Sequence, residues 1–140
     1  MFALVMACAA PAQVSISALI SEAQANEVRA TARHASQVYA ISGTVVGTGF
    51  RDTGVFEADA VGSSVRLQEL REPYAALVTP DGAAFYCTFE GARAAATLEV
   101  GQFVSLQGRF GYFWRAPEGT RVVFRECRPL GERRGSPRRR

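Results

Sequence analysis

The first regular hydrophobic pattern lies in residues 15–34, and its period is that of a helix. The apolar residues that share one stripe are Ile16, Leu19, Ile20, Ala23 and Ala30. His34 ends the same stripe, and Ser15 or Ser17 can cap the start of the segment. Because no proline or glycine interrupts it, we expect a helix over residues 15–34.

From residue 38 onward the hydrophobic period changes to two, which is typical of β-strands. The pattern predicts strands over residues 38–46, 74–79, 83–89, 103–110 and 121–128. Gly43, inside the first strand, indicates a bend or a close approach of two backbones.

The segments between these strands differ in character. Pro80, Asp81 and Gly82 predict a tight turn, because proline sets φ at the first turn position and glycine accepts a positive φ. Residues 91–98 are rich in alanine and predict one or two helical turns, whereas residues 111–120 predict a loop. Residues 47–64 predict a long loop or a hairpin extension, and residues 65–70 alternate again as a strand does.

Five strands with a short helix between the third and the fourth are typical of the OB-fold, a small Greek-key barrel. We therefore expect a mainly β protein with an N-terminal helix and a five-stranded OB-fold barrel, and a β-sandwich fragment is the alternative. The barrel with its helix takes up residues 13–131, which is one domain of ordinary size.

Charge is concentrated at the C-terminus. The net charge is +3, and the arginines of the tail, residues 132–140, are Arg133, Arg134, Arg138, Arg139 and Arg140. The remaining chain is therefore close to neutral, which argues against a broad phosphate-binding face. The tail has too little apolar surface to fold, and we expect it to be disordered.

The N-terminal residues 1–12 resemble the end of a secretory signal peptide. They are apolar and uncharged, and Ala10-Pro11-Ala12 has the small-x-small pattern of a cleavage site. A buried N-terminal segment and a lipid anchor at Cys8 are the alternatives. We therefore expect a periplasmic or secreted protein, with a membrane-anchored lipoprotein as the alternative, and no other apolar stretch is long enough to span a membrane.

A resemblance to a known family is carried by short segments in a fixed order. They are Asn26, then Ile41-Ser42-Gly43-Thr44-Val45, Tyr86-Cys87-Thr88-Phe89, residues 100–108 (VGQFVSLQG) and Phe124-Arg125-Glu126-Cys127. Together they resemble the bacterial tRNA-anticodon-like OB-fold family, whose members are often lipoproteins or exported proteins of unknown function. The resemblance implies the OB-fold and a cysteine pair on the adjacent third and fifth strands. It implies no catalytic residue and no tRNA binding.

The cysteines are Cys8, Cys87 and Cys127. Cleavage after Ala12 removes Cys8 and leaves an even pair in an oxidising compartment. With the strand adjacency that the resemblance implies, we expect a Cys87–Cys127 disulfide. Two buried thiols are the alternative.

The sequence favours a protein that is not an enzyme. His34 is the only histidine, so no His/Cys metal cluster exists, and we expect this residue to be packed or solvated at the helix end. The spacing of Asp52, Glu57 and Asp59 matches no calcium loop. We expect neither a metal nor another cofactor.

The candidate ligand-binding residues are Tyr112, Phe113, Trp114 and Arg115. They lie in the expected loop between the last two strands, which helps to frame the ligand face of an OB-fold. If the strand continues past Gly111, alternation places Phe110, Tyr112 and Trp114 on one side. The same rings can instead cover one mouth of the barrel or extend the hairpin.

These observations favour a non-catalytic, exported OB-fold module that binds a protein, a small molecule or an oligosaccharide. The alternative is a protein that binds single-stranded nucleic acid through Tyr112, Trp114 and the arginine tail. A structural envelope protein that pairs a partner strand at the open edge of the barrel is a third possibility.

We predict that signal peptidase cleaves after Ala12, because its pocket admits small residues such as Ala10 and Ala12. The intact mass of the protein purified from its native host then corresponds to a chain that begins at Gln13. Met1 retained on soluble cytoplasmic protein would contradict export, and a diacylglycerol on Cys8 would favour the lipoprotein alternative.

Overall fold

The computed structural model describes residues 10–53 and 70–130. The elements in chain order are β1 (Ala12–Gln13), α1 (Ile16–His34), β2 (Val38–Thr53), β3 (Leu70–Val78), β4 (Ala84–Thr88), α2 (Ala92–Ala96), β5 (Phe103–Ala116) and β6 (Gly119–Pro129). The expected mainly β structure with an N-terminal helix is confirmed, although β1 and the full lengths of β2 and β5 were not expected.

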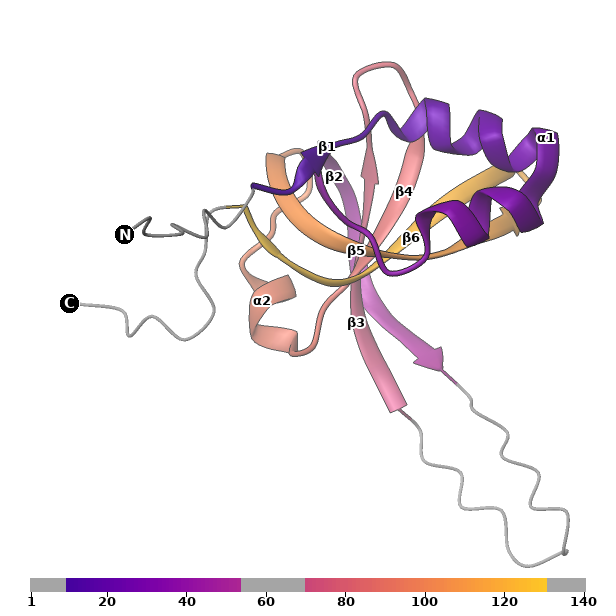
Figure 1. Cartoon of the computed structure of the whole chain (residues 1–140). Coiled ribbons are helices and arrows are strands. Elements are labelled where there is room, and N and C mark those ends of the chain that lie inside the picture. The colour runs from indigo at the N-terminus through magenta and orange to yellow at the C-terminus, as the bar shows by residue number, and fades with distance from the viewer. Residues whose placement is uncertain (1–9, 54–69, 131–140) are drawn as a thin grey trace, which may run out of the picture.

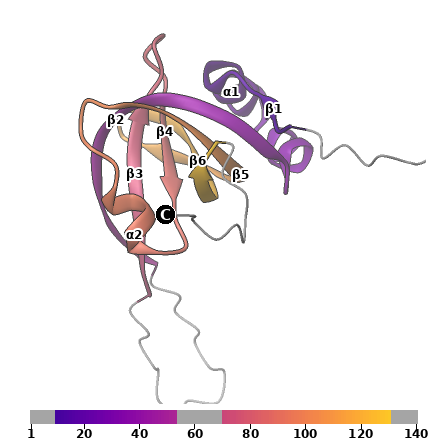
Figure 2. The ribbon, with the colours of Figure 1, turned by 90° about the vertical axis from the view of Figure 1, so that its left-hand side faces the viewer.

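The strands form one mixed sheet in the order β1-β2-β3-β4-β6-β5, and β2 pairs with β5 as well. Figure 2 shows β2 as a long arc across the molecule. Its first half pairs with β5, and its second half pairs with β3. Gly43 lies at the change of partner, where a Cβ would stand 3.0 Å from the Val78 carbonyl oxygen and 2.9 Å from the Phe85 ring. The close approach expected at Gly43 is thereby confirmed.

The turn between β3 and β4 has the predicted geometry. The amide of Gly82 donates to the Thr79 carbonyl over 2.9 Å, and Gly82 has a φ of 89°. The Asp81 carboxylate accepts hydrogen bonds from the hydroxyls of Thr79 and Ser17. Because Ser17 belongs to the first turn of α1, this carboxylate fastens the turn to the start of the helix.

Helix α1 is broken at Asn26, and the expectation of one uninterrupted helix was wrong. Ser15 caps the first half, whereas Asn26 takes an extended conformation (φ −162°, ψ 97°) inside the element. Its side-chain oxygen accepts a hydrogen bond of 3.0 Å from the Arg29 amide, as the cap of a new helix does. Figure 1 shows the two helical stretches of α1 meeting at a bend.

The two halves of α1 are joined through His34. Its Nε2 lies 2.6 Å from the Glu22 carboxylate, and its Nδ1 lies 2.6 Å from the Tyr39 hydroxyl. A carboxylate only accepts, so Nε2 carries the proton, and in the neutral ring Nδ1 accepts from Tyr39. The hydrogen bond from His34, supported by the positive charge of Arg33, lowers the pKa of Glu22. His34 is buried with both nitrogens bonded, which confirms that it is a packed residue.

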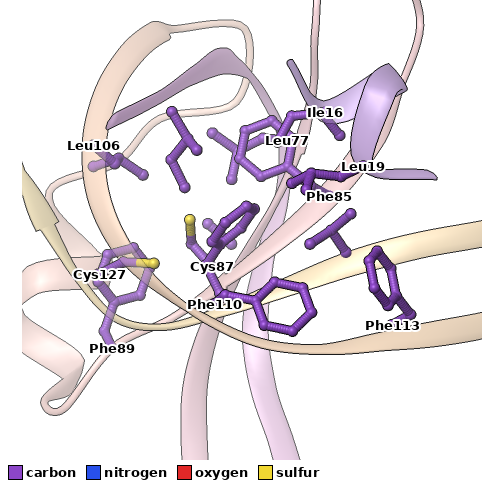
Figure 3. Packing of buried hydrophobic residues seen from close by; sticks show 14 of the residues in the cluster. Ile16, Leu19, Leu77, Phe85, Cys87, Phe89, Leu106, Phe110, Phe113 and Cys127 are labelled. Carbon is purple, nitrogen blue, oxygen red and sulfur yellow. The ribbon is translucent and has the colours of Figure 1, made fainter. Parts of the chain in front are cut away.

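The hydrophobic core lies between the sheet and α1, which packs against β5 and β6. Phe85, Cys87 and Phe89 point into it as their alternation predicted, and Leu106 faces them from β5. Figure 3 shows these side chains together with Ile16 and Leu19 from the helix. The core therefore fixes which side of β4 faces outward, and Tyr86 lies on that side.

Residues 111–120 are not the expected loop. β5 runs on to Ala116, and β6 begins at Gly119, so only two residues connect the strands. The register shifts between Phe110 and Tyr112, which makes Gly111 the extra residue of a β-bulge. A Cβ on Gly111 would lie 2.8 Å from the Val123 carbonyl oxygen.

The bulge changes which side chains of β5 face outward. Phe110 and Phe113 are both buried in the core, whereas Trp114 is 42% exposed and Tyr112 is half-buried. The expectation that Phe110 shares a side with Tyr112 and Trp114 was therefore wrong, because the extra residue inverts the alternation.

Several sequence-based expectations lie outside the described residues. These concern residues 1–9 with Cys8, residues 54–69, and the tail. Within the described part, residues 47–53 continue β2 and pair with β3, as a hairpin extension does. The predicted cleavage site after Ala12 falls inside β1, which pairs with Tyr39 and Ala40 of β2.

We predict that Gly111→Ala destabilises the protein by about 1–3 kcal/mol, since the added methyl group meets a backbone oxygen that cannot turn away. Gly47→Ala is the matched control, because a Cβ there meets nothing within 4 Å. Urea unfolding should place the control within about 0.5 kcal/mol of the native protein. Equal stability of the two variants would contradict the bulge geometry.

Candidate functional site

A groove of about 250 Å³ opens on the outer face of the sheet. Its lining residues come from five strands and are Phe50, Arg51, Tyr74, Tyr86, Thr88, Trp114 and Val123. Tyr86, Thr88 and Val123 belong to the neighbouring strands β4 and β6 and form the floor. We call this feature the aromatic groove.

Strand alternation explains why these side chains face outward. Phe85 and Cys87 enter the core, so Tyr86 between them points to the other side. Tyr74 of β3 is paired with Thr88 of β4, and side chains at paired positions share a face. The groove is thus lined by side chains that alternate along the strands with the core residues and point away from the core.

The rings of the aromatic groove form a connected series. The centroids of Tyr74 and Tyr86 are 6.0 Å apart in an edge-to-face arrangement, and those of Tyr86 and Trp114 are 5.4 Å apart. Gly49 makes room for the first ring, because a Cβ there would lie 3.2 Å from Tyr74. Phe50 is 58% exposed at the edge of the groove. Together these rings offer a stacking surface that is open to solvent.

Three arginines lie over the rings. The Arg51 guanidinium carbon is 5.3 Å from the Tyr112 centroid and 5.9 Å from that of Trp114. Arg125 also lies 5.3 Å from Tyr112, and Arg121 is 5.7 Å from Tyr86. These distances are those of cation–π contacts, which hold planar cations on ring faces.

The described carboxylates near these arginines are fewer than the arginines. Glu118 pairs with Arg121 at 3.6 Å, and its side chain is 70% exposed. Glu72 is the cross-strand partner of Arg51. An exposed pair of this kind contributes little, so Glu118 holds the Arg121 guanidinium only weakly.

The structure places the four candidate residues that the sequence suggested on different surfaces. Tyr112 and Trp114 belong to the outer face, with Trp114 in the aromatic groove. Phe113 points into the core. Arg115 makes an ion pair of 3.3 Å with Glu27 of α1 and does not line the groove. Only two of the four therefore belong to one surface.

Sequence reasoning missed the residues that β2, β3, β4 and β6 contribute. They are Phe50, Arg51, Tyr74, Tyr86, Arg121 and Arg125. The alternation of β4 contained a usable signal, since a residue between the inward Phe85 and Cys87 must face outward. Arg51 could not be found in this way, because it lay in an expected loop or hairpin extension.

Cys87 and Cys127 are both buried and are thiols in this structure. Burial, and then the neighbouring Cys127 thiol, raises the pKa of Cys87 well above its usual value. A thiol with a raised pKa is a poor nucleophile and a poor metal ligand. The strands that carry the two residues, β4 and β6, are neighbours in the sheet, as the resemblance implied, and they pair in parallel. Figure 3 shows both sulfurs in the core.

Little else in the described residues offers chemistry. No three His, Cys, Asp or Glu side chains of residues 10–53 and 70–130 are grouped so that they could hold a metal ion. Of the acidic cluster, Asp52 is the last residue but one of β2 and is paired with Arg71 of β3, and Glu57 and Asp59 lie outside the described residues. The aromatic groove is thus the candidate site that the described side chains support best.

Comparison with protein-family models, with curated proteins and with solved structures found no match to this chain. The resemblance to the tRNA-anticodon-like OB-fold family therefore stays a prediction. In the described part of the chain, no helix has the length and apolar character needed to cross a membrane.

We predict that Cys87 and Cys127 form a disulfide in the protein isolated from its native host without reductant. The two cysteines lie on paired strands in one core, and a bond between them stabilises the fold by about 2–4 kcal/mol. Thiol labelling in denaturant should find no free thiol before reduction and two afterwards. Two free thiols before reduction would exclude the bond, and Cys87→Ser with Cys127→Ser is the unbonded control.

Proposed function

We propose that this protein is a non-catalytic, exported binding module with an OB-fold barrel, and that its ligand binds in the aromatic groove. The observation that carries the proposal is the series of Tyr74, Tyr86 and Trp114 rings, flanked by arginines on an exposed sheet face. The exposure of such rings to water is unfavourable in free energy unless a ligand or partner covers them.

The barrel is supported by the strand pairing. β2 pairs with β3, β3 with β4, β4 with β6, β6 with β5 and β5 with β2. The short helix α2 lies between β4 and β5 in the chain. This order, with one parallel pair between β4 and β6, agrees with the five-stranded Greek-key barrel of the OB-fold.

A binding role without catalysis is supported by the chemistry of the titratable side chains. His34 has both nitrogens engaged inside the fold, and Cys87 is buried with a raised pKa. Neither residue lines the aromatic groove. The groove itself supplies ring faces, hydroxyls and guanidinium groups, which bind and orient a ligand.

Two classes of ligand suit exposed rings. Sugars and small planar molecules stack on them, and so do the bases of single-stranded nucleic acid. The near-neutral charge of the chain before the tail argued against a broad phosphate-binding face. The arginines on the same face as the rings, in contrast, favour the nucleic-acid alternative. Export and a small ligand remain the leading proposal.

We predict that Trp114→Ala leaves the melting temperature within about 2 °C of the native protein and removes ligand binding. Trp114 is 42% exposed, so its loss costs little packing. As the only tryptophan of the chain, it reports binding in the native protein directly, whereas isothermal titration calorimetry measures the loss of binding in Trp114→Ala, which has no tryptophan. The Trp114 emission should shift saturably with a neutral oligosaccharide, a nucleoside or a single-stranded oligonucleotide.

Acrylamide quenching of the free protein provides a second test. An open groove leaves the Trp114 emission accessible to the quencher and close to that of a solvated indole. A blue-shifted, quencher-protected emission, or a large loss of melting temperature in Trp114→Ala, would identify the residue as a packing lid. Phe113→Ala is the contrasting variant, because it empties a core position and should lower stability by about 3–5 kcal/mol.

A further inference from the structure

Arg51 connects the two walls of the aromatic groove. It belongs to the part of β2 that pairs with β3, whereas the rings that it covers, Tyr112 and Trp114, belong to the part of β5 that pairs with β6. Its guanidinium lies 5.3 Å and 5.9 Å from those two ring centroids. The side chain therefore reaches across the groove floor of β4 and β6.

The position over Trp114 is suited to a flat group, because a planar guanidinium already lies over that ring, 5.9 Å from its centroid. The groove volume of about 250 Å³ has room for one such ring. A puckered sugar would match this position less well than a planar base. The geometry favours a planar aromatic ligand at Trp114.

The arginines on the same face indicate which chemical group the planar ligand carries. Arg51 and Arg125 both approach Tyr112, and Arg121 approaches Tyr86. Guanidinium groups bind phosphate through two parallel hydrogen bonds, and this bond is stronger than a cation–π contact at a solvated surface. A phosphate beside the ring would draw Arg51 from the ring face and leave that face to the base.

We propose that the aromatic groove binds a nucleotide, free or within a single strand, and that Arg51 is the residue that selects a phosphate-bearing ring over a neutral one. This inference rests on the proposed binding function and adds the ligand class to it. The base takes the place of the Arg51 guanidinium on Trp114, and Arg51 pairs with the phosphate.

The experiment titrates the native protein with adenosine, AMP, inorganic phosphate and a short oligo-dA, and follows the Trp114 emission. AMP or oligo-dA should bind at least about tenfold more tightly than adenosine, which corresponds to one charge-assisted contact. Inorganic phosphate should bind more weakly than AMP, because it makes the contact with Arg51 without a stacked base. Tighter binding of oligo-dA than of AMP identifies the strand as the source of the nucleotide, and equal binding identifies the free nucleotide.

Arg51→Gln should reduce the preference for AMP over adenosine to less than about threefold, and Arg51→Lys should retain part of it, since lysine keeps the charge but not the planar fork. Arg93→Gln is the control, because Arg93 is exposed on α2 and does not line the groove, yet its loss changes the net charge equally. Circular dichroism confirms that each variant is folded.

Two results would overturn the inference. Equal affinity for adenosine and AMP would remove the phosphate preference, and a preference that survives in Arg51→Gln would remove the role of Arg51. Both leave the stacking function intact. If none of the nucleotide probes binds while an oligosaccharide still shifts the Trp114 emission, the binding function stands and the ligand class is wrong.

Discussion

The outward direction of Tyr112 and Trp114 depends on the β-bulge at Gly111, where a side chain would have its Cβ 2.8 Å from the Val123 carbonyl oxygen. Without the bulge at Gly111, regular alternation from the buried Phe110 would carry Tyr112 and Trp114 inward and Phe113 outward. The bulge inserts one residue, so that Phe110 and Phe113 both fill the core, with their ring centroids 5.1 Å apart. Gly111 therefore determines which rings of β5 are exposed on the outer face and which rings are buried in the core.

A second glycine contact shapes the opposite side of the groove. Gly43 lets β2 pass within van der Waals distance of Val78 and Phe85, and there β2 changes its partner from β5 to β3. The rest of β2 then runs along β3 and places Phe50 and Arg51 beside Tyr74. Because the groove needs both β2 and β5, it depends on the strong curl of one strand and the bulge of another.

Much of this fold could be predicted from local pattern. The strands with strict alternation, the Pro80-Asp81-Gly82 turn and the start of α1 at Ser15 each follow from side chains that specify their own conformation. The break at Asn26 and the bulge at Gly111 do not. An asparagine within a helical stripe is a residue of modest helix propensity, and it becomes a cap only because the second half of α1 folds back. A glycine after a strand is as typical of a loop as of a bulge.

The candidate site was predictable only where local pattern along one strand determines the direction of a side chain. Trp114 and Tyr112 were recognised as a cluster, but their partners come from strands that are distant in the sequence and become neighbours only in the sheet. Tyr86 could be assigned to the outer face from its alternation with Phe85 and Cys87. The contact of Arg51 with two rings of β5 could not, because it depends on the register of the whole sheet.

The Arg51–Tyr112–Arg125 arrangement also explains why the face can remain exposed without a ligand. Two guanidinium groups at 5.3 Å from the same centroid repel one another, and the electron-rich ring face between or beneath them reduces that repulsion. The rings in turn lose part of their contact with water to the flat cations. The guanidinium groups and the rings therefore each lower the free energy cost of exposing the other to water. The cation–π contacts that hold them together are individually weak in water. Such contacts exchange readily for a stronger one, which is the property that a binding surface requires of its ligand-free state.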